Sequence, residues 1–150
     1  MIYRSRFIIV LLAALVLLAV KCKKPGPEYV VNIYEQYFET NILNVDFRVK
    51  LATDNGSDLT SQYEGYRFRL LKNTYYDGPM TATRNGVVIN GTWSSNDDYS
   101  KLIITLNQPS VPAEFVWLNR SWRFTKKAIP IMELAPWGSQ DPHVLHMERL

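Results

Sequence analysis

The chain has 150 residues, the size of one domain, and its composition of 47% hydrophobic and 13% aromatic residues excludes a disordered protein. Its formal charge is +3, but Arg4, Arg6 and Lys21 lie in the first 21 residues, which contain no acid. The rest of the chain holds 14 basic and 14 acidic residues and is neutral. This balance gives no basis for binding nucleic acid, which depends on a basic face.

Residues 1–21 have the pattern of a secretory signal peptide. Arg4 and Arg6 form a positive start, and an uninterrupted apolar run follows from Phe7 to Val20. A helix of about 14 residues reaches about 21 Å, which is short of the roughly 30 Å hydrocarbon core of a bilayer. We therefore predict a signal peptide in preference to a transmembrane anchor.

Cys22 directly follows this segment and is the only cysteine, so the fold contains no internal disulfide. Its position resembles a bacterial lipobox, in which the cysteine becomes the lipidated first residue of the mature protein. Lys21 departs from that pattern, because a small residue is usual there. We predict lipidation at Cys22 and a cell-envelope location, anchored to a bacterial membrane, most simply the outer membrane. Plain secretion and a retained signal anchor are the alternatives.

Residues 22–43 are predicted to form a short tether and one helix. The tether contains Pro25-Gly26-Pro27, which suits neither a helix interior nor a strand. Apolar residues then recur at helical spacing and predict a helix of about ten to fourteen residues that ends near Asn41. We expect this apolar face to pack on its own domain, and a partner-binding face is the alternative. The apolar positions are Val30, Ile33, Tyr34, Tyr37 and Phe38.

Residues 44–150 change to short alternating segments separated by turn residues, which is an all-β pattern. Asn85-Gly86 is a strong hairpin turn. A run of hairpins favours a small antiparallel up-and-down barrel, because closure removes the exposed sheet edges. The eight predicted strands are 45–52, 66–70, 80–84, 87–93, 101–106, 122–124, 129–134 and 144–149.

Several segments of this region resemble the lipocalin-like domain of Bacteroidota lipoproteins, and they occur in that family's order. The resemblance covers residues 44–150 and implies a small barrel on a lipid tether. It implies no particular activity, and Gly91-Thr92-Trp93 lies mid-chain, whereas a Gly-x-Trp motif lies on the first strand of true lipocalins. The segments are Asp54-Asn55-Gly56-Ser57-Asp58-Leu59-Thr60-Ser61-Gln62-Tyr63, Gly65-Tyr66-Arg67-Phe68, Asn90-Gly91-Thr92-Trp93-Ser94, and Leu118-Asn119 before Trp122.

The polar residues of the chain form no recognisable catalytic or metal-binding pattern. His143 and His146 are the only histidines, and their odd spacing directs them to opposite faces of a strand. Asp54 and Asp58 lack the remaining ligands of a calcium loop. The sequence therefore predicts a protein that is not an enzyme and needs no cofactor or metal.

Two functions remain open for the barrel. It could bind a small apolar or glycan ligand in its interior, or the same interior side chains could fill it and leave a structural or interaction subunit of a cell-surface assembly. The interior residues predicted to line such a site are Tyr66, Phe68, Leu70, Leu102, Ile104, Trp122 and Phe124.

Overall fold

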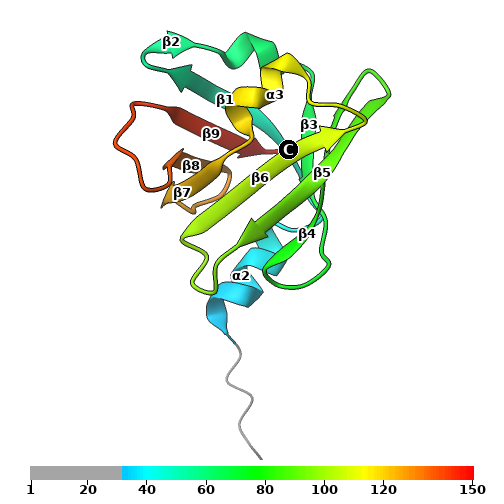
Figure 1. Ribbon diagram of the computed structural model, residues 1–150. Coiled ribbons are helices and arrows are strands. Elements are labelled where there is room, and N and C mark those ends of the chain that lie inside the picture. The colour runs from blue at the N-terminus through cyan, green and yellow to red at the C-terminus, as the bar shows by residue number, and fades with distance from the viewer. Residues whose placement is uncertain (1–31) are drawn as a thin grey trace, which may run out of the picture. The chain divides into compact units, whose positions relative to one another are not determined.

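The computed structural model describes residues 32–150, which form a closed antiparallel barrel of eight strands (Figure 1). From β3 to β9 each strand pairs with the next one in sequence, and β1 pairs with both β3 and β9. The two-residue β2 (Ser57–Asp58) only extends the end of β1 as a hairpin. The barrel strands are β1 (Asp46–Asp54), β3 (Arg67–Leu70), β4 (Asp77–Arg84), β5 (Val87–Ser95), β6 (Lys101–Gln108), β7 (Ser121–Lys126), β8 (Ile131–Pro136) and β9 (Val144–Arg149).

The all-β barrel predicted from the sequence is thus confirmed, with all eight strands in the expected order. Asn85-Gly86 turns the chain as expected, with φ angles of 52° and 80°. Asn55-Gly56 makes a second turn, between β1 and β2, with φ angles of 50° and 84°. The strand ends differ from the prediction by a few residues; β4, for example, begins at Asp77. The signal segment (1–21) and Cys22 lie outside the described residues.

Alternation along the strands places the apolar side chains inside the barrel. In β6, Leu102, Ile104 and Leu106 are buried, while the residues between them are only partly covered. In β1 the register with β9 shifts between Val49 and Leu51, so the inward position passes to Ala52.

The helix α2 (Ile33–Asn41) crosses one end of the barrel and has nine residues, fewer than predicted. Asn32 caps it, because its side-chain oxygen accepts hydrogen bonds from the backbone N–H groups of Tyr34 and Glu35. Phe38 is buried in the barrel, but Ile33 and Tyr34 are 71% and 58% exposed. The expectation that the whole apolar face packs on its own domain is therefore correct for Phe38 and wrong for these two residues.

Two short helical segments were not predicted. The 3-10 helix η1 (Thr60–Tyr63) follows β2, and α3 (Ala113–Leu118) lies between β6 and β7. The prolines Pro109 and Pro112 indicated only a break in the chain, yet α3 begins directly after Pro112, a position near a helix start where proline is tolerated. Within residues 32–150, no helix is long and apolar enough to span a membrane.

Gly91 allows β5 and β6 to approach closely. A Cβ atom at this position would lie 1.8 Å from the carbonyl oxygen of Thr105 and 2.7 Å from the Cα of Leu106. These neighbours are backbone atoms of β6 and cannot rotate away. The register between the two strands also shifts at this point, between Asn90 and Gly91, so the glycine sits where the sheet departs from regular pairing.

We predict that Gly91→Ala lowers the free energy of unfolding by about 3 kcal/mol, because the methyl group forces β5 and β6 apart. Thr92→Ala is the matched control, since Thr92 is an exposed neighbour in the same strand, and it should cost less than about 1 kcal/mol. Urea denaturation of the mature chain measures both values. Equal losses in the two variants would contradict the close approach.

Candidate functional site

The side chains predicted to line a ligand site lie in the barrel interior. All but one are buried, and Phe124 is half-buried. They belong to a single apolar core in which each packs against its neighbours. The seven are Tyr66, Phe68, Leu70, Leu102, Ile104, Trp122 and Phe124.

Helix α2 fills the end of the barrel that it crosses. The Phe38 ring centroid lies 4.6 Å from that of Tyr99 and 5.6 Å from that of Trp93, and the Phe124 ring meets it edge-on at 6.3 Å. Such tilted and edge-on arrangements are the favourable ones for aromatic pairs. Phe38 therefore acts as a plug made of the protein's own chain.

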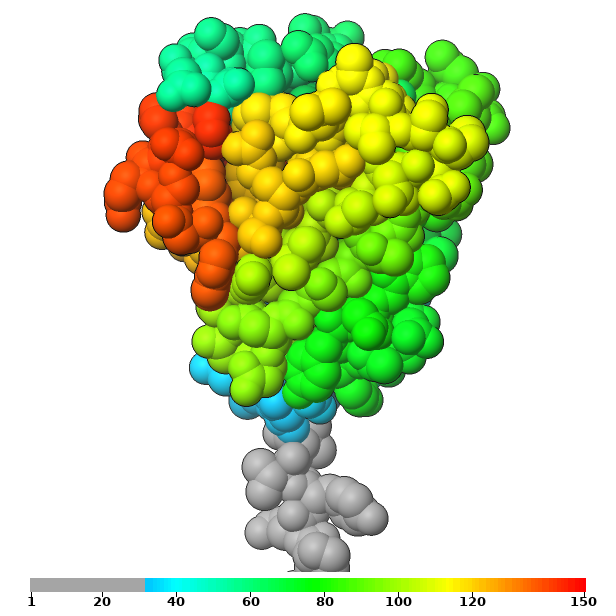
Figure 2. All heavy atoms as spheres, in the orientation of Figure 1, coloured from blue at the N-terminus to red at the C-terminus, as the bar shows by residue number. Residues whose placement is uncertain are grey.

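Helix α3 fills the opposite end. Strand β4 runs from one helix to the other, which shows that the helices lie at opposite ends (Figure 1). Tyr76, just before β4, hydrogen-bonds to α2, and Arg84, the last residue of β4, contacts α3. Phe115 packs 5.0 Å from the Tyr66 ring and 6.0 Å from the Phe68 ring. Figure 2 shows the segment around α3, in yellow, lying directly on the neighbouring strands on the visible face.

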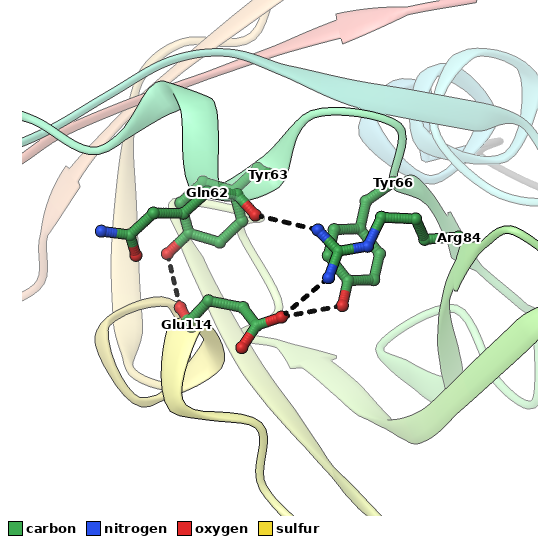
Figure 3. Close-up of polar contacts among 5 residues, drawn as sticks. All are labelled: Gln62, Tyr63, Tyr66, Arg84 and Glu114. Carbon is green, nitrogen blue, oxygen red and sulfur yellow. Dashed lines mark hydrogen bonds and ion pairs between the residues drawn. The ribbon is translucent and has the colours of Figure 1, made fainter.

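A polar cluster holds α3 in this position (Figure 3). The Glu114 carboxylate accepts a hydrogen bond from the Tyr66 hydroxyl at 2.9 Å and pairs with Arg84 at 3.3 Å. The Tyr63 hydroxyl donates to the Glu114 backbone carbonyl at 2.7 Å, and Arg84 also donates to the Gln62 carbonyl. The 3-10 helix, β4 and α3 are thus tied together at one point.

The surroundings of this cluster disfavour ionisation of its two phenols. Burial raises the pKa of the Tyr63 phenol, and the nearby Glu114 carboxylate raises it further. The pKa of Tyr66 is raised by burial and by its hydrogen bond to Glu114. Arg84 lies over the Tyr66 ring, 4.0 Å from its centroid. Both hydroxyls therefore remain donors at neutral pH, and each is used to hold α3.

Asn119 positions the other end of α3. Its side-chain amide donates to the Leu106 carbonyl at 3.0 Å and accepts from the Leu106 N–H at 2.7 Å. It therefore pairs with the backbone N–H and carbonyl groups of Leu106 in β6, as a neighbouring strand would. In the sequence, Leu118-Asn119 stood out only as part of the resemblance to a family, and its role beside β6 was not predicted. The paired roles of Glu114 and Arg84 had no sequence signal, because the two residues are far apart in the chain.

Two buried side-chain nitrogens at the α3 end have no hydrogen-bond partner among the described residues, Trp117 Nε1 and His143 Nδ1, whose rings lie 6.2 Å apart. Trp117 is buried, and its indole Nε1 has no hydrogen-bond acceptor among the described residues. An unsatisfied buried donor costs about 1–3 kcal/mol. The α3 end therefore carries a polar group whose hydrogen bond is open to an acceptor from outside the described chain.

Among the hollows lined by residues 32–150 are three on the outer surface, and none of these three is lined by the seven predicted interior residues. One of about 560 Å³ runs between α2 and Lys127. A second of about 530 Å³ lies beside Asn73 and Thr92, and a third of about 320 Å³ lies over the outer faces of β3 and β4. The first is the most apolar, because Ile33 and Tyr34 contribute to it.

The histidines and acids considered in the sequence do not gather into one site. His143 Nδ1 lies 2.8 Å from Asp54 Oδ1, although the contact lacks the geometry of a hydrogen bond. The Asp58 carboxylate accepts the Thr60 backbone N–H at 2.8 Å and so closes a local turn. Within residues 32–150, no group of three or more His, Cys, Asp or Glu side chains is arranged to hold a metal ion.

Comparison with known proteins adds no relative. No protein-family model, curated protein or solved structure matches this chain. The fold and the geometry described above are therefore the basis for any functional proposal, and the resemblance to lipocalin-like lipoproteins stays a prediction.

We predict that Glu114→Ala loosens α3 and lowers the free energy of unfolding by about 1–2 kcal/mol, because the buried Tyr66 hydroxyl loses its acceptor. The contribution of Arg84 is small, since that pair is partly exposed. Glu64→Ala is the control: it removes an exposed glutamate beside the same segment and should change stability by less than about 0.5 kcal/mol. Urea denaturation measures the free energy of unfolding of both variants. If Glu114→Ala were as stable as the parent, the cluster would not be holding the helix.

Proposed function

We propose that this chain is a lipid-anchored lipoprotein of a bacterial cell envelope, and that its barrel serves as a non-catalytic structural or interaction subunit. The observation that carries the second part is the filled interior, plugged at one end by Phe38 and at the other by Phe115. A barrel occupied by its own side chains offers its outer surface, and not its lumen, to partners.

The lipid anchor is supported by the sequence alone. Cys22 follows an apolar run that is too short to cross a bilayer and is the only thiol in the chain. The modification of such a cysteine supplies more than one acyl chain, and two chains hold a protein stably where one does not. The domain would then remain at the membrane surface, with the outer membrane as the simplest location.

The absence of catalysis is a proposal that rests on how the charged groups are used. Glu114 and Arg84, which lie partly covered at the barrel end, engage each other and the surrounding hydroxyls and carbonyls. They stabilise a helix, and this role accounts for every contact they make within the described residues.

A second candidate function, binding of a small apolar or glycan ligand, has one observation in its favour. The indole N–H of Trp117 is buried without an acceptor, and a ligand oxygen that reached beneath α3 would satisfy it. Ligand binding beneath α3 requires this helix to move away from the barrel end. The structural or interaction function requires no such movement.

The anchor is tested by metabolic labelling of the host with a fatty-acid analogue. We expect the parent chain to carry the label in the membrane fraction and Cys22→Ala to lose both the label and the membrane association. Ser57→Ala, an exposed position in the hairpin after β1, is the control and should be labelled like the parent. A Cys22→Ala variant that is labelled as strongly as the parent would refute the anchor.

The filled interior is tested by truncating a side chain that points into it. Leu102→Ala should lower the free energy of unfolding by about 2–5 kcal/mol, because it opens a void in a packed core. Ile103→Ala removes the same number of carbons from the outer face of the same strand and should cost clearly less. Denaturation in urea measures both.

The same proteins, screened for thermal shifts with fatty acids and oligosaccharides, separate the two candidate functions. The filled barrel predicts no saturable shift. A saturable rise in Tm that disappears in Trp117→Phe, together with a small cost for Leu102→Ala, would favour the ligand-binding function instead.

A further inference from the structure

One face of α2 is apolar and is largely left uncovered by the other described residues. Ile33, Tyr34 and Tyr37 are 71%, 58% and 37% exposed, whereas Phe38, on the adjoining side of the helix, is buried in the barrel. Residues three and four positions apart in a helix share a face. Tyr37 is four residues after Ile33 and three after Tyr34, so it joins the two into one surface. We call Ile33, Tyr34 and Tyr37 the α2 apolar face.

The α2 apolar face is held rigidly against the barrel. The Tyr37 hydroxyl donates a hydrogen bond to the Lys127 carbonyl at 2.6 Å, and the Lys127 ammonium lies 5.6 Å from the centre of the Tyr34 ring. The hollow of about 560 Å³ lies along the same helix and ends at Lys127. An apolar face that is fixed in place and carries a hollow is suited to a contact, since it loses little conformational freedom when it binds.

The acidic residues of α2 do not interrupt this face. Glu35 accepts a hydrogen bond from Tyr76 at 2.5 Å, and Glu39 pairs with Lys72 at 2.5 Å. Both partners belong to the segment between β3 and β4. The carboxylates are thus engaged with the barrel, and Lys127 is the charged group that borders the face.

The position of α2 in the sequence identifies what would cover the face. Asn32, its cap, is ten residues after Cys22, and ten extended residues span at most about 35 Å. If Cys22 carries the lipid, this end of the barrel stays within that distance of the bilayer surface. The eight residues of β4 extend about 26 Å. Because barrel strands tilt by roughly 40°, the other end lies about 20 Å farther along the barrel axis.

The chemistry of the face fits a bilayer interface. Tyrosine is enriched at the headgroup level, where its ring meets the acyl chains and its hydroxyl meets water. Lys127 at the edge is partly covered and donates to the Asp98 carbonyl at 3.3 Å, so it adds a positive charge beside the face without being a free anchor. A tether also raises the local concentration of the surface into the millimolar range, so a contact that is weak on its own becomes populated.

We propose that the α2 apolar face docks on the lipid bilayer at headgroup level, so that the barrel stands on the membrane with α2 toward the lipid and α3 away from it. This inference rests on the proposed lipid anchor. It goes beyond the anchor because it gives the barrel a fixed orientation and names the surface left for partners, the α3 end.

The test uses the mature chain from Cys22 onward, coupled through its single thiol to a maleimide lipid in vesicles of phosphatidylethanolamine and phosphatidylglycerol. A Tyr34→Trp variant places a fluorophore on the α2 apolar face, and Val116→Trp places one on α3, where Val116 is 65% exposed. Acyl chains brominated near the headgroup quench a tryptophan that reaches them. The uncoupled parent protein gives the signal of the native tryptophans, which is subtracted.

We expect bromolipids to quench the Tyr34→Trp signal at least threefold more than the Val116→Trp signal. Adding Ile33→Ser to the Tyr34→Trp chain should remove most of that difference, since Ile33 is the most exposed apolar residue of the face. Equal quenching of the two positions would overturn the orientation. Concentration-dependent dimerisation without vesicles, accompanied by a blue shift of the Tyr34→Trp signal, would also overturn it, because the face would then belong to a second copy.

This experiment distinguishes a failure of the docking proposal from a failure of the anchor proposal. Chemical coupling does not depend on lipidation in the cell. Quenching of the Tyr34→Trp signal in a protein that takes up no fatty-acid label would defeat the natural anchor and leave an apolar face with bilayer affinity. A labelled protein whose Tyr34→Trp signal is not quenched would keep the anchor and defeat the docking.

Discussion

The pairing of β1 with β9 closes the sheet, and a closed sheet of eight strands encloses a volume that something must occupy. In this chain the occupants are its own side chains. Among the aromatic rings of the core, Trp93 meets Phe38 of α2, Phe68 meets Phe115 of α3, and Trp122 meets Trp117 of α3. Because the interior is filled, the lumen has no free space for a ligand. Any contact with a partner therefore involves the outer surface or the two ends.

The two ends are built by different interactions. At the α2 end a single apolar plug enters the core, and the rest of the helix presents uncovered apolar side chains beside Lys127. At the α3 end the helix is held by a carboxylate, a guanidinium and two phenols, and by the amide of Asn119. Both ends leave apolar side chains exposed, Ile33 and Tyr34 at α2 and Val111 and Val116 at α3. The ends therefore differ in how each helix is held.

Period-two burial and Asn-Gly turns predicted the eight strands and the barrel, because both depend on residues close in sequence. The interior positions Leu102 and Ile104 followed from the same alternation. Helix α3 was missed, since Pro112 reads as a break and a six-residue helix carries little periodicity. The Glu114–Arg84 contact and the exposure of Ile33 depend on how distant segments meet, which a single sequence does not encode in any local pattern.

The most direct measurement of the central claim is a crystal structure of the mature chain, purified from its own host without refolding and pressurised with xenon. Xenon enters apolar cavities that water leaves empty. The account predicts no xenon and no added density between Tyr66, Leu102 and Trp122, where the side chains themselves fill the barrel. Xenon peaks along the barrel axis, or the elongated density of a retained ligand there, would contradict it.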